Sequence, residues 1–295
     1  MPFPLKSLHY DLCRRLRELA SPAEAYDLQI AAPHFYGLKP LQQTTHPSPV
    51  IIVSFNDNHQ LCAESVSMSK MNDKRTLELN NSVLHIVEQS LILSKFTTLC
   101  DAKIIFDHFI LAPREIRFYD CDLTPKLLYN VSEKIKKNFS SLNITFCRFH
   151  DGATFELVCK LFKKPTFLCV CVLDTSFVNH TWIDALTANE YSNMHSIDIH
   201  HVGIDILNID ESQLIEFMKA QQNFFMVNIV LKNEIDDSEV KQSLNRLFGD
   251  LFEPLGENTY ARKYITIRWT SSETHHKRTY GLRDDSVLLY CKACQ

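Results

Sequence analysis

Apolar and polar residues alternate in five segments along the middle of the chain. Each segment begins with apolar residues two positions apart, which is the period of a strand with one buried face. The segments cover residues 116–123, 144–151, 170–177, 197–204 and 227–234. Because their first residues lie 26 to 30 positions apart, the pattern predicts one strand in each unit of a repeat.

An amphipathic segment follows most of these strands. Apolar residues at helical spacing come after capping residues at four places, namely Thr124-Pro125, Asp151, Asp210 and Asp237. One strand and one helix per unit predict an α/β fold with parallel strands. Two arrangements fit this pattern: a curved β/α solenoid whose strands line the concave side, and the ordinary β–α pairs of a compact domain.

The first thirty residues predict two short helices. Leu12, Leu16 and Leu19 are spaced i, i+4 and i+7, so the first helix carries an apolar stripe. Residues 21–24 (SPAE) combine a serine N-cap, a proline at the first helical position and a glutamate that completes a capping box. A second helix is therefore expected to begin at Pro22.

The segments that flank the repeat are less regular. Residues 49–55 predict a buried strand, 67–74 a loop and 83–96 a helix, while 77–84 fit an irregular first repeat as one alternative. Beyond Gly256, residues 263–269 and 286–292 alternate with period two, and the segment 270–278 is interpreted as loop material. These patterns divide the chain into four parts, with boundaries at 1–45 (helical), 46–112 (irregular α/β), 113–252 (repeat) and 253–295 (β-rich cap).

Composition narrows the classes of function. The net charge of -4 arises from 31 basic and 35 acidic residues spread along the chain, so neither nucleic acid nor a membrane surface is an expected partner. No segment approaches the roughly 20 apolar residues that a membrane span needs. The ten cysteines, several of them inside apolar runs, are typical of a reduced cytoplasmic or nuclear protein. Six glycines in 295 residues leave no glycine-rich phosphate loop, and no cofactor is predicted.

Three small clusters of residues are considered as metal-binding or catalytic sites. Cys291 and Cys294 make half of a zinc site, and residues 195–201 (HSIDIHH) place side chains on a strand without an evident third ligand. Cys147 with His150 lacks the local signature of a nucleophilic pair. No catalytic residue and no metal site is predicted, and a metal-dependent enzyme stays a remote alternative.

Residues between the apolar positions of each strand are expected on the face opposite the helices. This face would be mixed in charge and moderately apolar, which suits a protein partner. The predicted substrate-binding residues on it are Arg117, Tyr119, Thr145, Cys147, Cys171, Asp198, His200 and Asn228.

Three units fit the template L-x-L-x-x-N/C-x-L, and through it the repeat resembles the leucine-rich repeat. Its positions are Ile116, Phe118, Cys121 and Leu123 in the first unit, Val170, Val172, Thr175 and Phe177 in the second, and Ile197, Ile199, Val202 and Ile204 in the third. The unit at 144 keeps Ile144 and Phe146 but departs from the template at Phe149 and Asp151.

A second resemblance rests on the opening Phe3-Pro4-Leu5, on the helix junction at 21–24, and on the leucines between and after them. Through these residues the stretch 3–34 resembles the F-box, most closely the F-box-like form of nematode families, with departures at His9 and Pro33. In that family the helices dock onto a Skp-type adaptor of a cullin ubiquitin ligase. The resemblance implies that the adaptor-binding residues are Pro4, Leu5, Leu8, Leu12, Leu16 and Leu28.

Together these observations predict a non-catalytic substrate-recognition adaptor of a Skp/cullin (SCF-type) ubiquitin ligase. Its first 45 residues would bind the Skp-type subunit, and the repeats would hold a protein substrate near the ubiquitin-transfer machinery. The alternative is a free-standing leucine-rich-repeat-like protein-binding scaffold, in which the N-terminal helices serve only as a cap.

Overall fold

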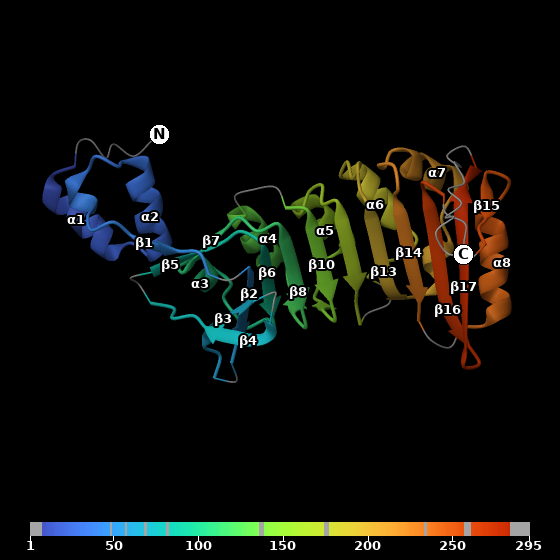
Figure 1. Ribbon diagram of the computed structural model, residues 1–295, viewed down its shortest axis with the longest axis horizontal. Coiled ribbons are helices and arrows are strands. Elements are labelled where there is room, and N and C mark those ends of the chain that lie inside the picture. The colour runs from blue at the N-terminus through green and yellow to red at the C-terminus, as the bar shows by residue number, and fades with distance from the viewer. Residues whose placement is uncertain are drawn as a thin grey trace. The chain divides into compact units, whose positions relative to one another are not determined.

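The computed structural model describes residues 8–47, 49–56, 58–67, 70–80, 83–135, 139–173, 177–232, 235–256 and 261–283. It is an α/β structure, as predicted, with eight α-helices among these residues (Figure 1). The chain forms two compact units. The first comprises Met1–Ile116 and Tyr129–Phe139, and the second comprises Arg117–Leu128 and Ser140–Gln295.

The first unit opens with the two predicted helices. Helix α1 spans Tyr10–Leu19 and α2 spans Pro22–Ala31, followed by the short 3-10 helix η2 (Tyr36–Leu38). The capping box is present, because the Ser21 side chain accepts from the Glu24 backbone N–H and the Glu24 carboxylate accepts from the Ser21 backbone N–H. The local signal in the sequence therefore specifies where α2 begins.

A small core and one buried glutamine hold these helices together. Cys13, Ala32 and Leu38 form the core, with Leu8, Leu28 and Phe35 packed against it. Gln29 is buried on α2 and ties the helix to the chain that follows η2. Its Nε2 donates to the carbonyls of Leu38 (2.7 Å) and Pro40 (2.8 Å), and its Oε1 accepts from the backbone N–H of Gln42 (2.7 Å).

Strands make up the rest of the first unit. A parallel three-stranded sheet contains β1 (Gln43–Thr45), β5 (Val83–Val87) and β7 (Phe109–Leu111), next to the short helix α3 (Lys103–Phe106). The strands β6 (Ser90–Ser94), β2 (Val50–Phe55), β3 (Leu61–Ser67) and β4 (Lys70–Thr76) lie side by side in that order. The strand predicted at 49–55 is thus confirmed as β2.

Two predictions in this unit are wrong. The segment 83–96 forms β5 and β6 and not a helix. Leu84, Val87 and Leu91 are spaced i, i+3 and i+7, so buried strands interrupted by a turn mimic a helical stripe. The loop predicted at 67–74 contains the start of β4, whose residues alternate poorly because they are mostly polar.

The second unit is built on parallel strands that alternate with helices. The strand order is β15-β17-β16-β14-β13-β12-β10-β8, and all neighbours from β10 to β16 are parallel. The strands are β8 (Glu115–Tyr119), β10 (Ser141–Thr145), β12 (Phe167–Cys171), β13 (Ser196–Val202), β14 (Met226–Leu231), β15 (Phe252–Pro254), β16 (Tyr264–Ser271) and β17 (Thr274–Leu282). The predicted parallel strands are confirmed, although β10 and β12 begin three residues before the predicted positions.

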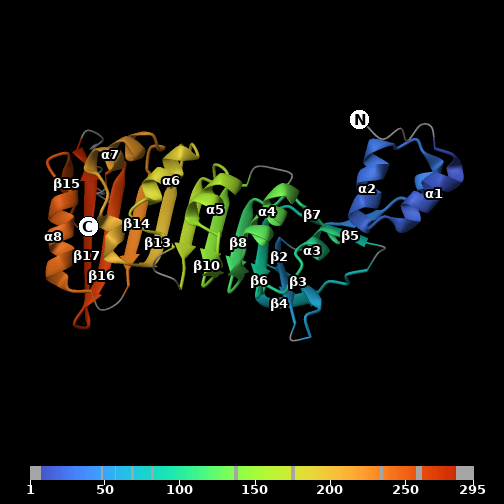
Figure 2. The same ribbon diagram turned by 180° about the vertical axis from the view of Figure 1, so that it is seen from behind.

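Five helices of the chain lie along one face of these strands, as Figures 1 and 2 show. They are α4 (Pro125–Lys134), α5 (Phe155–Leu161), α6 (Trp182–Ala188), α7 (Glu211–Lys219) and α8 (Asp237–Leu247), with the 3-10 helix η3 (Ile204–Leu207) after β13. The apolar row Ile144, Val170, Ile199, Ile229 and Ile267 runs across the strands and is fully buried. Within the described residues no helix covers the opposite face, which we call the open face.

A left-handed residue follows β8 and β10 and interrupts the pairing of β13 next to its last residue. Asp120, Phe146 and His201 have φ of 51°, 56° and 61°, and the residue after each of them is buried. This turn moves the following side chain to the helix side of the sheet. The predicted place of Cys147 on the open face is therefore wrong: Phe146 is the exposed residue, and Cys147 is fully buried.

The C-terminal end of the described chain is a β-hairpin. Strands β16 and β17 are antiparallel, and Ser272 and Glu273 between them both have positive φ, as a type I′ turn requires. The predicted strand at 263–269 is confirmed, whereas the loop predicted at 270–278 is mostly strand. The predicted strand at 286–292 and the pair Cys291 and Cys294 lie outside the described residues. No helix in the described ranges has the length and apolarity to cross a membrane.

Candidate functional site

The open face carries seven of the eight residues predicted to bind a substrate. They occupy two rows that cross the strands at matching positions. One row contains Asn143, Cys169, Asp198, Asn228 and Thr266, and the next contains Thr145, Cys171, His200, Val230 and Arg268. Arg117 and Tyr119 lie on the same face of β8, and Tyr119 meets Phe146 edge-on with ring centroids 5.9 Å apart.

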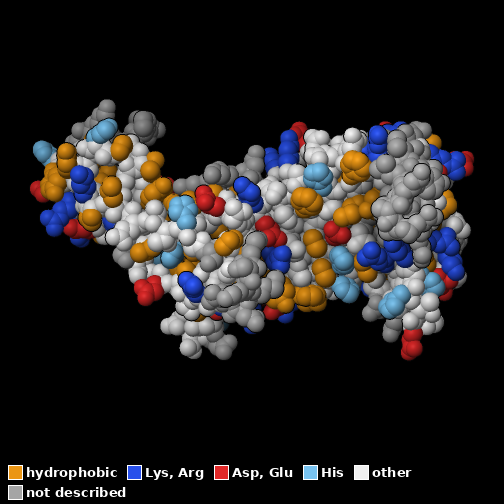
Figure 3. All heavy atoms as spheres, in the orientation of Figure 1, with side chains coloured by type: hydrophobic (Ala, Val, Ile, Leu, Met, Phe, Trp, Pro, Cys, Tyr) orange, Lys and Arg blue, Asp and Glu red, His pale blue; other side chains and the backbone are white. Residues whose placement is uncertain are grey.

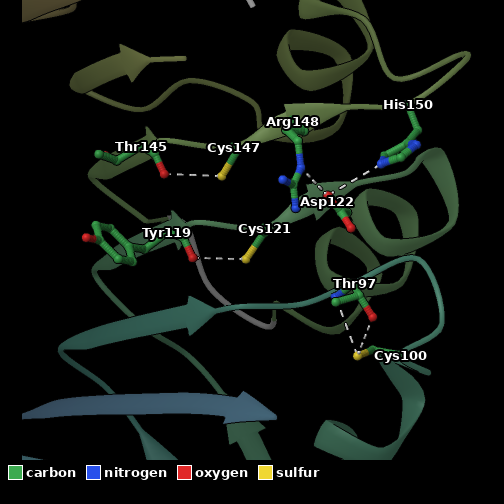
Figure 4. A network of polar contacts seen from close by, with 9 residues as sticks. All are labelled: Thr97, Cys100, Tyr119, Cys121, Asp122, Thr145, Cys147, Arg148 and His150. Atoms are coloured by element: carbon green, nitrogen blue, oxygen red, sulfur yellow. Dashed lines mark hydrogen bonds and ion pairs between the residues drawn. The ribbon is translucent and has the colours of Figure 1, made fainter. Parts of the chain in front are cut away.

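Cys147 instead belongs to a buried contact between successive repeat units of the second compact unit (Figure 4). Its Sγ donates to the Thr145 carbonyl at 3.4 Å, and in the preceding unit Cys121 Sγ donates to the Tyr119 carbonyl at 3.3 Å. A hydrogen bond with the Cys121 side chain lowers the pKa of Cys147 against the effect of burial. The thiol faces the core and is closed to a substrate.

His150 does not activate this thiol. Its Nε2 lies 3.5 Å from Asp122 Oδ1, and Arg148 Nε donates to the same oxygen at 2.8 Å (Figure 4). These contacts join the two-residue strands β9 (Asp122–Leu123) and β11 (Arg148–Phe149). The arrangement links two successive repeat units. His150 contacts Asp122, so Cys147 and His150 do not form a nucleophilic pair.

The two cysteines of β12 remain protonated near neutral pH. Burial raises the pKa of Cys169 to about 11, and the nearby charge of Asp198 adds to the rise. Burial also raises the pKa of Cys171. Because the thiolate is the form that attacks electrophiles and binds metals, neither side chain is primed for such chemistry. No group of three or more His, Cys, Asp or Glu side chains in the described ranges is placed to hold a metal ion.

Asp198, Asn228 and His200 form the polar centre of the open face. Asn228 Nδ2 donates to Asp198 Oδ1 at 3.1 Å, while Asn228 Oδ1 has no hydrogen-bond partner among the described residues. Burial lowers the pKa of His200. The nearby charge of Asp198 opposes this effect, and the neighbouring His201 and Arg268 lower the pKa further. His200 is therefore neutral near pH 7, and the centre offers acceptors for an incoming donor.

A cavity of about 290 Å³ opens beside this centre. Its lining includes Asp198, Asn228, Tyr264, Thr266, Arg268 and Lys277. The last four come from the hairpin β16–β17. The sequence predicted its first strand, at 263–269, but not its second. The polar positions 264, 266 and 268 alternate with buried residues, so the pattern of β16 already contained the signal for three of them.

A second cavity, of about 690 Å³, lies at the start of α5 and α6. Its aromatic lining consists of Phe149, Phe155, Phe177 and Trp182, and its acidic lining consists of Asp151, Glu156 and Asp184. None of the predicted site residues lines it. Glu156 and Asp184 lie in the first turns of their helices, where a carboxylate complements the helix dipole.

The predicted adaptor-binding residues fall into four groups. Leu12 is 54% exposed on α1, whereas Leu8 and Leu28 pack against the internal core of Cys13, Ala32 and Leu38. Leu16 is half-buried. Pro4 and Leu5 lie outside the described residues.

Other apolar side chains join Leu12 at the surface of this part of the chain. Leu19 is 69% exposed and Ile30 is 65% exposed, and Tyr10 is also exposed. Hydrophobic side chains are visible on this helical part in Figure 3. The exposed stripe is therefore carried by Leu12 and Leu19 more than by the other leucines.

No protein-family model, curated protein or solved structure matches the chain.

Proposed function

We propose that this chain is a non-catalytic adaptor of a Skp/cullin ubiquitin ligase. Helices α1 and α2 would bind the Skp-type subunit in the manner of an F-box. The repeats, which we interpret as a leucine-rich-repeat-like solenoid, would hold a protein substrate on the open face. The chain itself would perform no chemistry and would raise the rate of ubiquitin transfer through effective concentration.

The exposed apolar side chains of the helical part are the observation that carries this proposal. Leu12, Leu19 and Ile30 each leave more than half of their surface in water. Full burial of a leucine or isoleucine is worth about 1.5–3 kcal/mol, so covering the exposed halves of these three gives roughly 3–5 kcal/mol. A partner with a complementary apolar groove would gain this free energy without disturbing the core of Cys13, Ala32 and Leu38.

The open face supports the substrate-binding half of the proposal. Each strand contributes one side chain to each row, and the rows combine charged, amide, hydroxyl and apolar groups. The thiols of Cys169 and Cys171 on this face are protonated, so neither is primed as a nucleophile. This chemistry favours recognition of a protein surface over catalysis.

Co-purification with a Skp-type adaptor tests the proposal. Leu12→Asp combined with Leu19→Asp is expected to weaken capture of the adaptor at least tenfold, because two charges would enter the apolar contact. Arg14→Gln is the matched control, since Arg14 is an exposed residue of the same helix whose ion pair with Glu18 contributes little. Equal recovery of the adaptor with the double variant and the control would refute the adaptor function.

A free-standing scaffold is the second candidate, favoured by the internal packing of Leu8 and Leu28. In that case the helices would serve as a cap that stabilises the fold. Deletion of residues 1–40 would then abolish cooperative thermal unfolding of the remaining chain. An adaptor module would be removed without that loss, so circular dichroism of the truncated chain separates the two functions.

A further inference from the structure

Two positive side chains stand next to each other on the open face of the hairpin. Arg268 on β16 and Lys277 on β17 are direct cross-strand partners, and both are exposed. Side chains at such positions have their Cβ atoms about 5 Å apart, and like charges there repel each other. Within the described part of the chain, neither makes an ion pair with an acidic side chain.

Hydroxyl groups lie beside these two charges. Thr266 and Thr279 are the next partners along the hairpin on the same face, and their Oγ1 atoms are 3.1 Å apart. Thr266 is buried at 5% exposure. All four side chains line the cavity of about 290 Å³. This end of the cavity therefore offers two positive charges and two hydroxyls to a negatively charged group.

The opposite end of the same cavity has the reverse character. Asp198 on β13 is negative, and Asn228 on β14 presents an unpartnered acceptor oxygen. The acceptor end lies on β13 and β14 and the positive end on β16 and β17, so their midpoints are two strand spacings of about 4.8 Å apart. The positive end is also displaced by two residues along the strands, which makes the separation of the two ends roughly 12 Å. The cavity thus has an acceptor end and a positive end at a defined separation.

The size of the cavity excludes a lone small anion as its full occupant. Water takes about 30 Å³ per molecule in the liquid, so the cavity has room for about ten waters. In an extended peptide, side chains four residues apart lie on the same side and about 13 Å from each other. That spacing matches the separation of the two ends.

We infer that this cavity binds an extended segment of a protein partner in which an acidic and a basic side chain are four residues apart. The acidic side chain would lie between Arg268 and Lys277, and the basic one would meet Asp198 and Asn228. The inference rests on the proposed function only in taking the open face as the substrate-binding face. It names the class of substrate as a segment with two opposite charges at fixed spacing.

Blocked pentapeptides provide the test, measured by calorimetry or NMR titration of the full chain at low salt. Ac-KAAAE-NH2, or the reversed order Ac-EAAAK-NH2, is expected to bind at least fivefold more tightly than the versions with Gln in place of Glu or Lys. Arg268→Gln and Lys277→Gln should each weaken binding at least fivefold, and Asp198→Asn should affect only peptides that contain lysine.

Arg278→Gln is the matched control, because Arg278 is the next residue of β17 on the opposite face. It should bind the peptides as the unchanged chain does, and circular dichroism should show all four variants folded. Equal binding of the Glu and Gln peptides, or an equal loss in Arg278→Gln, would overturn the inference. A peptide with phosphoserine in place of Glu that bound a hundredfold more tightly would also overturn it, in favour of a phosphate site.

The adaptor assay distinguishes this result from the proposed function. Arg268→Gln leaves α1 and α2 untouched, so co-purification of the Skp-type adaptor should not change. Loss of peptide binding with intact adaptor capture therefore supports the cavity assignment. Failure of every peptide to bind, with adaptor capture intact, refutes the inference and leaves the adaptor function standing.

Discussion

Gln29 is the side chain on which the position of α2 most depends. Its three hydrogen bonds reach the carbonyls of Leu38 and Pro40 and the backbone N–H of Gln42, and Gln42 in turn accepts from Arg17 Nη2 on α1 at 3.1 Å. Replacing Gln29 with methionine keeps the volume of the side chain and removes all three bonds. The three backbone groups would then be buried without partners.

The expected cost follows from these three bonds. A hydrogen bond of this type contributes about 0.5–1.5 kcal/mol net, and an unsatisfied buried group costs about 1–3 kcal/mol. Because water reaches part of the loop once it loosens, we expect a total of roughly 2–4 kcal/mol. The internal core of this part is small, so the loss should appear as local unfolding of residues 8–47 with the second unit still folded.

Hydrogen exchange followed by mass spectrometry measures this effect directly. Gln29→Met should expose the amides of α1 and α2, whereas amides of β12 to β14 should keep their protection. Gln29→Glu is expected to be worse at pH 7, because it places a negative charge against two carbonyl oxygens, and to recover partly at low pH. Arg14→Gln, an exposed residue of α1, serves as the control and should change stability by less than about 0.5 kcal/mol.

A result below 0.5 kcal/mol for Gln29→Met would refute this reasoning. It would mean that the segment after η2 is held by packing alone. Global unfolding of the chain in one transition would refute the local character of the effect but not its size.

Three further predictions concern other positions. Gly37→Ala should lower the denaturation midpoint by the equivalent of about 1–3 kcal/mol, because an added Cβ would lie 2.6 Å from Cys13 Cβ. Because the pKa of His200 is lowered in the folded chain, His200 takes up a proton more readily in the unfolded chain. The free energy of unfolding should therefore fall as pH drops below about 6.5. In urea titrations, His200→Gln should reduce this dependence of stability on pH. Burial alone would raise the pKa of Asp122, but Arg148 and His150 reverse the effect and the pKa is lowered. The stability that this carboxylate contributes should therefore be lost as pH falls below about 4. In thermal scans, Asp122→Asn should remove this part of the loss of stability in acid.

The sequence predicted the features that depend on local signals. The capping box at 21–24 and the period-two alternation of β13, β14 and β16 need only neighbouring residues, and the structure confirms them. The helix caps were placed less accurately: Thr154 and Asp236 cap α5 and α8, where Asp151 and Asp237 were expected. Several neighbouring residues could serve as the cap of each helix, so tertiary packing decides which of them does.

The features it missed depend on backbone conformation or on pairing. Phe146 adopts a left-handed conformation although it is bulky, and nothing in its neighbours signals this, so Cys147 was assigned to the wrong face. The hairpin turn at Ser272 and Glu273 lacks the Asn-Gly or Gly signature of a type I′ turn. Without that turn, the meeting of Arg268 with Lys277 is not visible in the sequence.

The rows on the open face have a consequence for how such a surface is altered. Each strand supplies one side chain to a row, and its buried neighbours belong to a separate apolar row that packs under the helices. A substitution at Asn143, Cys169 or Asn228 therefore changes one side chain of a row on the open face and leaves the buried apolar row intact. A chain of this kind can acquire a new partner through single substitutions on the open face, one strand at a time, while the apolar row under the helices stays unchanged.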